Sequence, residues 1–312
     1  MPADAAPAAE GLAIPEGLII VDPDTIPSEP APETFYRHRV PLFRALRATW
    51  GRREIVFALA ERDVRTSYKQ ASLGMLWALI SPVLQVVLFT LIFSHVKGLK
   101  PPAGVPYIIY SYVGLLCWGF FSGSLGSGGS SMVANLTLLQ KTNFPRECFP
   151  LSQILEQTLY TAIGLIPLGI LLGVHGFAPK LGSLWVPLIL VVELLFTIGL
   201  TLMMAAFIVY VRDLAQVTGI ILSLGLFATP IIWPLSKLSN ISFGPFHHVD
   251  MRPYYSLFNP LGPVMDSVRR TALLNQAPDW KLLGLGALSA CFYFVIGYRL
   301  FKRLEVYFAD IS

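Results

Sequence analysis

Long apolar runs separated by short charged segments dominate the chain after Lys69. No Asp, Glu, Lys or Arg lies between Lys69 and Lys97, and 40 consecutive residues lack these charges between Lys100 and Lys141. A helix needs about 20 apolar residues to cross a bilayer, and most of these runs exceed an ordinary buried helix. The pattern therefore predicts an integral membrane protein with six transmembrane helices. The predicted spans are 73–94, 106–128, 151–173, 184–210, 214–235 and 282–301.

Composition agrees with a membrane protein and limits the possible site chemistry. Hydrophobic residues make up 54% of the 312 residues, charged residues only 13%, and the mean hydropathy is +0.61. A soluble chain has about 25% charged residues, so this one cannot cover a water-facing surface. Its three cysteines are scattered without CxxC spacing, which argues against a disulfide framework or a zinc site. We expect no metal site in this chain.

The N-terminal segment differs from the rest of the chain. Residues 1–33 hold seven acidic residues, seven prolines and no Lys or Arg. A signal peptide needs a basic start followed by an apolar core, so we expect a disordered acidic tail over 1–35 instead. Over 36–70, basic and apolar residues alternate as in a helix that lies in the headgroup layer, although a soluble basic helix is the alternative. The apolar residues that would share its face are Leu42, Leu46, Trp50 and Phe57.

The distribution of basic residues predicts the orientation. Six spans leave both termini on one side, together with the segments around 138–153 and 212. That side carries 15 Lys and Arg residues and the opposite side carries 8. Because basic residues favour the cytoplasm, both termini are expected there, including 306–312. Residues 71–305 would form the six-span domain.

Four stretches together resemble a known family. They are "DVRTSYKQASLGMLWALISPVLQ" (63–85), "LLQKTNFPRECFPLS" (138–152), "RDLAQVTGIILSLGLFATPIIWPLS" (212–236) and "NPLGPVMDSVRRTAL" (259–273). Their order and the six-span pattern are similar to the permease subunits of type-2 ABC transporters that export polysaccharides such as O-antigen, capsule or teichoic acid. The resemblance covers about residues 36–305 and leaves the acidic tail unexplained.

The resemblance implies a fold and an assembly. The fold would be all-α, with a cytoplasmic coupling or gate helix between spans two and three and re-entrant helices between spans five and six. The chain would form a homodimer in the inner membrane, in contact with membrane lipids, and pair with two ABC ATPase subunits. It would export an undecaprenyl-linked polysaccharide for lipopolysaccharide biosynthesis, with no role for nucleic acid.

The same resemblance assigns the ATP and Mg²⁺ to the partner, so this chain would be no enzyme and hold no cofactor. The sequence agrees, because it has no Gly-Lys dipeptide and therefore no phosphate-binding loop of the G-x-x-x-x-G-K type. The run "GSLGSGGSS" (123–131) lacks that lysine. Its small residues indicate either close helix contact or a flexible exit from the membrane.

The segment between spans two and three is the candidate coupling site. Pro145 and Pro150 fix backbone angles and limit helix continuation, which suits a rigid lever. Arg146 and Glu147 could pair with charges on a partner, although a plain polar loop is the alternative. The residues expected to contact the ATPase and form the cytoplasmic gate are Lys141, Phe144, Pro145, Arg146 and Glu147.

Two further sets of residues are assigned by the resemblance. A sugar-conducting channel would use aromatic faces, although aromatic residues also gather at membrane interfaces for other reasons. The expected channel residues are Trp77, Gln85, Phe89, Phe227 and Trp233. The loop after span five would form the outer gate, unless it is simply an exposed loop. The expected gate residues are Asn259, Pro260, Asp266 and Arg269.

Other functions stay open from the sequence alone. Glu156 and Glu193 lie inside spans, where a carboxylate either pairs with a neighbour or relays protons. A relay would favour a proton-coupled flippase of lipid-linked glycans. An ABC exporter of a small molecule or lipid would share the six spans. A membrane glycosyltransferase is less compatible, because it should show paired acids in a cytoplasmic loop that faces the membrane, and we find none outside the acidic tail.

Overall fold

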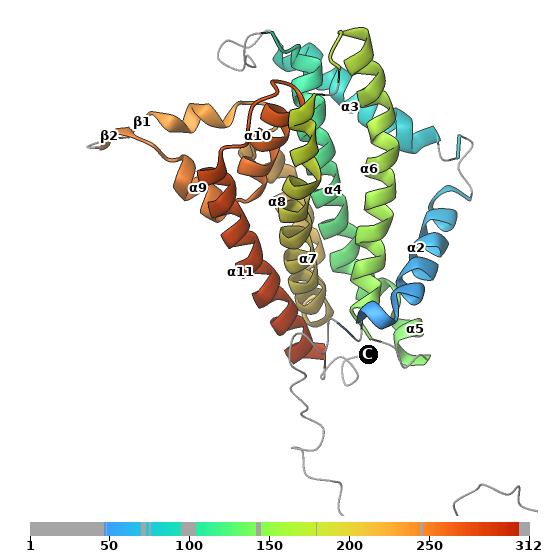
Figure 1. Cartoon of the computed structure of the whole chain (residues 1–312). Helices are drawn as coiled ribbons and strands as arrows, with labels where there is room; N and C mark the ends of the chain where they lie inside the picture. Colours follow the sequence, from blue (N-terminus) through green and yellow to red (C-terminus); the bar gives the residue numbers. More distant parts are fainter. Residues whose placement is uncertain are drawn as a thin grey trace, which may run out of the picture. The chain divides into compact units, whose positions relative to one another are not determined.

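The computed structural model describes residues 47, 49–69, 73, 74, 76–94, 104–141, 145–178, 180–243 and 246–305. Nearly all of these residues are helical, and most of the helices lie side by side (Figure 1). The acidic tail, Leu42, Leu46, Phe144 and the C-terminal segment 306–312 lie outside the described residues.

The elements follow one another as a series of long helices interrupted by short ones. In chain order they are α2 Arg53–Tyr68, α3 Leu76–Phe93, α4 Tyr107–Ala134, α5 Leu136–Lys141, α6 Cys148–Val174, η3 Leu181–Trp185, α7 Val186–Tyr210, α8 Leu214–Ala228, η4 Leu235–Ser239, β1 Ile241–Phe243, β2 Phe246–Val249, α9 Arg252–Phe258, α10 Leu261–Ala272 and α11 Trp280–Leu304. The antiparallel pairing of β1 with β2 is a small departure from the all-α prediction.

Among the described residues, five helices are long and apolar enough to cross a membrane: α3, α4, α6, the continuous helix Leu181–Tyr210 and α11. The chain is therefore a multi-pass membrane protein. At the predicted fifth span, α8 has only 15 residues. At 1.5 Å per residue its length is about 22 Å, whereas the hydrocarbon layer is about 30 Å thick. Length and composition thus support five crossings, and the sixth stays a prediction.

Helix α4 lies at the centre of the packing and contacts α3, α6, α7, α8 and α10. The helix at predicted span two runs beyond residue 128, because the small-residue run continues it to Ala134. A Cβ atom on Gly128 would collide with the side chain of Thr201 on α7, and one on Gly129 would press on Ile208 and Met204 of the same helix. The small residues therefore permit close helix contact rather than a flexible exit.

Helices α7 and α11 form a second close pair. A Cβ atom on Gly297 would collide with the backbone of Gly199, and one on Gly199 would meet the backbone of Tyr293 and Phe294. Glycines at both positions let the two helix backbones approach directly, so van der Waals contact along the pair is extensive.

By contrast, α3 and α8 each present an apolar face that the described chain leaves uncovered. Leu84, Leu88 and Leu91 are exposed on α3. On α8 the exposed apolar side chains include Ile220, Ile221, Leu224 and Phe227. In a membrane protein, such faces are covered by lipid or by another subunit.

Helix α2 packs against α6, and Figure 1 shows it beside the end of α6 that lies near α5. Leu59 and Ala60 are buried in this contact, whereas Trp50 and Phe57 are exposed. Whether the exposed face lies in the headgroup layer stays a prediction.

Polar contacts join α2 to α6 and account for one of the two intramembrane acids. Gln153 donates to Asp63 over 2.7 Å. Buried Glu156 accepts hydrogen bonds from Tyr160 at 2.6 Å and from Ser67 at 3.3 Å. Glu156 therefore has structural partners.

Glu193 on α7 is also buried, and one of its carboxylate oxygens has no hydrogen-bond partner among the described residues.

Candidate functional site

The start of α6 and the end of α11 meet in a buried polar cluster, here called the Glu147 cluster (Thr49, Glu147, Tyr298, Lys302 and Glu305). The Glu147 side chain is only 1% exposed. It accepts hydrogen bonds from Thr49 and Lys302, both at 2.6 Å, and from Tyr298 at 3.4 Å. Lys302 also pairs with Glu305 at 2.8 Å. A buried carboxylate is stable only when paired and hydrogen-bonded, and these partners supply both conditions.

A tight turn brings Glu147 to this position. The amide of Cys148 donates to the Pro145 carbonyl at 3.1 Å, and the amide of Leu151 donates to the Glu147 carbonyl at 3.1 Å. The Arg146 amide donates to the Glu305 carboxylate at 3.4 Å, and its guanidinium donates to the Glu305 backbone carbonyl. The predicted coupling segment is therefore attached to the end of α11 as well as to α6.

The predicted coupling residues lie in different elements and environments of the structure. Pro145, Arg146 and Glu147 form the turn, whereas Lys141 ends α5 with its side chain outside the described part. Direct pairing of Glu147 with a partner's charge does not fit, because this buried carboxylate is engaged within the chain. The contribution of Thr49, Tyr298 and Lys302 was not predicted. The one signal for it in the sequence is the basic end of α11, which supplies the cation that a buried glutamate needs.

A second site lies where α8 ends, at the opposite end of the helices from α5 (Figure 1). The helix stops at Ala228, before Thr229 and Pro230, and residues 228–233 form what we call the elbow. A helix end leaves carbonyl groups without backbone partners, and at membrane depth these must be satisfied by protein. Trp233 of the elbow and side chains from three other helices, α4, α9 and α10, supply the donors. The pairs are Trp233 to Phe227 at 3.0 Å, Tyr255 to Ala228 at 3.0 Å, Arg269 to Pro230 at 2.6 Å and to Ile231 at 2.7 Å, and Tyr107 to Ile232 at 3.3 Å.

Arg269 on α10 makes the largest contribution to the elbow. Its side chain is buried, and its Nε donates to the Tyr110 carbonyl on α4 at 3.0 Å. The guanidinium carbon lies 3.7 Å from the centroid of the Tyr110 ring, a cation–π contact. Gly114 makes room for this group, because a Cβ atom there would collide with the guanidinium. Arg269 thus ties α10, the elbow and α4 together.

Asn259 and Pro260 complete the junction. The Asn259 amide donates to Thr229 at 3.1 Å and to the Tyr255 hydroxyl at 2.9 Å, and its oxygen accepts from the Leu261 amide at 3.1 Å. Pro260 is buried at the start of α10. Two of the four predicted gate residues, Asn259 and Arg269, therefore contact the elbow, while Asp266 faces a neighbouring cavity. Their role as a gate stays a prediction.

An ion pair fixes the start of α9 after the β-hairpin. Asp250 accepts from the Arg252 amide at 3.0 Å and from its guanidinium at 2.9 and 2.8 Å. These hydrogen bonds lower the pKa of Asp250 below its ordinary value. The carboxylate therefore stays charged at neutral pH.

The predicted channel residues fall into two groups. Trp77, Gln85 and Phe227 are exposed on α3 and α8. Phe89 packs edge-on against Phe93, and the Trp233 indole is held by the carbonyl of Phe227. The exposed side chains of the first group are available to contact a ligand or a second subunit. For both groups, a position along the channel wall stays a prediction.

Comparisons with known proteins point to one family. Residues 54–266 match the family described as ABC-2 type transporter. The chain is 30% identical over 250 residues to the O-antigen export system permease protein RfbA of Myxococcus xanthus. The aligned region covers 80% of this chain and 92% of that protein. It is 24% identical over 259 residues to two proteins of the same name from Klebsiella pneumoniae, covering 83% of this chain and 95% of each relative.

Proposed function

Because the chain belongs to the ABC-2 type transporter family, we propose that it is the membrane-spanning subunit of an ATP-driven exporter of lipid-linked, O-antigen-like polysaccharide. The observation that carries this proposal is similarity to O-antigen export permeases over 80% or more of the chain. The family match over residues 54–266 includes Glu147 and the elbow. The cargo we propose is an undecaprenyl-linked glycan.

We further propose how the chain is assembled. Family membership implies an ATPase partner, and two such subunits would bind ATP and Mg²⁺. Two copies of this chain would form a homodimer. The uncovered apolar faces of α3 and α8 support the homodimer, because a second copy would bury side chains such as Leu88 and Phe227. Trp77, Gln85 and Phe227 would then line or border the path of the glycan.

The proposed topology places the protein in the inner membrane with both termini in the cytoplasm. In this arrangement α8, the elbow and η4 together complete a sixth crossing. Helices α9 and α10 would be re-entrant at the outer face. The distribution of basic residues, 15 on the proposed cytoplasmic side against 8, supports this orientation.

The contacts suggest how ATP-driven closure of the partner would move the permease. A force on α5 and the Pro145–Glu147 turn would pass to the end of α11 through Arg146, Lys302 and Glu305. Helix α11 packs on α7, α9 and α10, so its movement would reach the outer elbow through rigid contacts. The Glu147 cluster is then an internal link of the lever, and the ATPase would bind neighbouring exposed residues.

A reconstitution experiment tests this proposal. The purified chain, with and without its ATPase, is placed in liposomes that contain undecaprenyl-linked glycan, and transfer across the membrane is measured. We expect transfer only with the ATPase and ATP, and none with an ATPase variant that binds but does not hydrolyse ATP. Transfer by the chain alone, or equal transfer with the inactive ATPase, would overturn the proposal.

The unpartnered oxygen of buried Glu193 favours one alternative, a proton-coupled flippase. Glu193→Gln removes a proton carrier while keeping the side-chain volume. ATP-driven export should persist in this variant and in a collapsed proton gradient. Export that requires both Glu193 and the gradient would instead support the flippase.

A further inference from the structure

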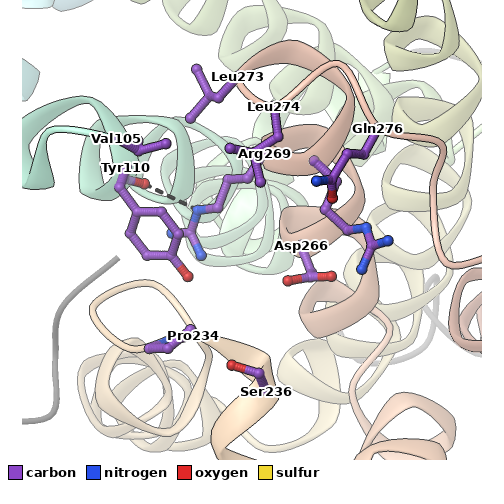
Figure 2. Close-up of a pocket in the computed structure, with 10 residues that line it drawn as sticks. Val105, Tyr110, Pro234, Ser236, Asp266, Arg269, Leu273, Leu274 and Gln276 are labelled. Carbon is purple, nitrogen blue, oxygen red and sulfur yellow. Dashed lines mark hydrogen bonds between the residues drawn. The ribbon is translucent and has the colours of Figure 1, made fainter. Parts of the chain in front are cut away.

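A cavity of about 250 Å³ lies beside the elbow on the proposed outer side (Figure 2). It is formed by the start of α4, the segment after the elbow, α10 and the turn that follows α10. Asn275 adopts a left-handed backbone conformation (φ 54°) in that turn, and the amide of Gln276 donates back to the Arg270 carbonyl at 2.9 Å. This reversal brings Gln276 to the rim of the cavity.

The polar groups around the cavity include both donors and acceptors. Asp266 supplies a carboxylate, Arg270 a guanidinium and Gln276 an amide, and Ser236 adds a hydroxyl. Ser236 and Gln276 are exposed, so the cavity has a solvent-accessible rim. Apolar side chains line the remaining wall. They are Val105, Pro234, Leu273 and Leu274.

The Tyr110 hydroxyl is the observation that points to a ligand. Tyr110 is only 3% exposed, yet its hydroxyl has no hydrogen-bond partner among the described residues. Figure 2 shows this hydroxyl pointing toward the space between Pro234, Ser236 and Asp266. A buried hydroxyl without a partner is unfavourable, so a ligand that bonds to it removes an existing penalty.

We propose that this cavity binds one sugar residue of the exported glycan, which rests on the function proposed above. A sugar ring combines hydroxyl groups, which need both donors and acceptors, with C–H faces that pack on apolar side chains. The cavity offers this combination. Its volume is below the roughly 300–1,000 Å³ of pockets for drug-sized ligands, which suits a single ring.

Charged ligands fit the cavity less well. The Asp266 carboxylate would repel a phosphate group, although Arg270 would attract it. A metal ion would find one carboxylate beside a guanidinium, and no group of three acidic, histidine or cysteine residues occurs among the described residues. The Arg269 guanidinium is already engaged with three carbonyl groups and the Tyr110 ring, so it remains a positioning residue for the cavity wall.

Ligand-detected NMR on the full permease–ATPase complex in nanodiscs tests this inference. Glucose, galactose, mannose, rhamnose and N-acetylglucosamine are added separately at millimolar concentrations, and saturation transfer from protein to sugar is measured. At least one sugar should give a signal, and inorganic phosphate should not displace it. Tyr110→Phe and Asp266→Asn should each weaken binding by about five-fold, the effect of one hydrogen bond. Tyr110→Phe keeps the ring beneath Arg269.

Tyr112→Phe is the matched control. Its hydroxyl lies on the same helix but donates to the Gly164 carbonyl of α6 at 2.9 Å, outside the cavity. Sugar binding should be unchanged in this variant. If a pocket variant fails to fold, Gln276→Ala at the exposed rim serves in its place. Equal binding in all variants, no sugar signal with the wild type, or displacement by phosphate would overturn the inference. ATP-driven export by the wild type is measured separately, so the proposed function can stand if the sugar site fails.

Discussion

At the scale of single residues, buried charges are held by donors and acceptors from distant parts of the chain. Glu147 is bonded by residues 98 and 155 positions away, Thr49 and Lys302. Arg269 bonds carbonyl groups of α4 and the elbow. In both cases the charged group connects segments that are adjacent only in the folded chain, so its removal should affect more than one helix.

Glu147→Gln should lower the free energy of unfolding by about 2 kcal/mol, because it removes a charged acceptor of Lys302 and Thr49. Thermal unfolding of the purified chain in detergent measures the effect. Glu61→Gln is the control, since Glu61 pairs with Arg65 at an exposed position and its loss should change little. Similar melting temperatures for the two variants would contradict the internal role of Glu147.

Arg269→Lys should lower the free energy needed to open the elbow locally by about 2–4 kcal/mol. The reason is that an ammonium group cannot donate to all three carbonyl groups as the planar guanidinium does. Hydrogen exchange of the amides in 228–235 should become faster. Arg270→Lys at the next position should leave that exchange unchanged, since its guanidinium donates to the Ala277 carbonyl at 3.4 Å, outside the elbow. Slow exchange in Arg269→Lys would show that the elbow does not depend on this side chain.

At the scale of helices, glycines decide which pairs pack closely. Gly199 and Gly297 bring α7 and α11 into backbone contact, and Gly128 brings α4 against α7. At other glycines in the same helices, such as Gly284, an added Cβ atom would have nothing within 4 Å. Two substitutions that look alike in the sequence should therefore have opposite effects.

Gly297→Ala should destabilise the chain by about 1–3 kcal/mol, because the new methyl group collides with the backbone of Gly199. Gly284→Ala on the same helix should be neutral or stabilising by up to about 1 kcal/mol, since alanine favours the helix and space is free. Thermal unfolding of both variants in one detergent gives the comparison. A reversed order would mean that α7 and α11 are not in contact there.

At the scale of the whole molecule, α3 and α8 are helices that expose many of their apolar side chains. Only 6% of the apolar stretch of α3 is buried, against 67% for α4. Such a difference indicates that α4 belongs to the centre of the subunit and that α3 borders lipid or another copy. The homodimer proposal assigns at least part of this α3 surface to contact with a second copy of the chain.

Phe227→Cys on α8 should cross-link to its copy in native membranes when a short bis-maleimide is added. Exposed Cys291 must first be replaced by alanine, whereas Cys117 and Cys148 are buried. Leu188→Cys, exposed on α7, is the control and should remain monomeric on a denaturing gel. Cross-linking at 188 but not at 227 would place the subunit contact elsewhere.

The sequence by itself determined the membrane class, the order of the long helices and the family resemblance. Continuous apolar runs such as 184–210 can be accommodated only in lipid, and spans one, three, four and six were located to within a few residues. The motif around Pro145 and Glu147 was also singled out from local pattern, and the resemblance singled out Asn259 and Arg269 as expected gate residues.

Only the tertiary structure decided the ends of the helices and the partners of the polar side chains. Hydropathy continues past Ala228, but α8 ends there before Pro230, and Arg269, Tyr255 and Tyr107 satisfy the carbonyl groups that the helix end leaves open. Nothing local to Glu147 reveals that Lys302 will neutralise it. The free energy of transferring apolar side chains from water into lipid is roughly a sum over the residues of a segment, so it can be read from the sequence. Hydrogen bonds and ion pairs instead depend on which distant atoms the fold brings within about 3 Å.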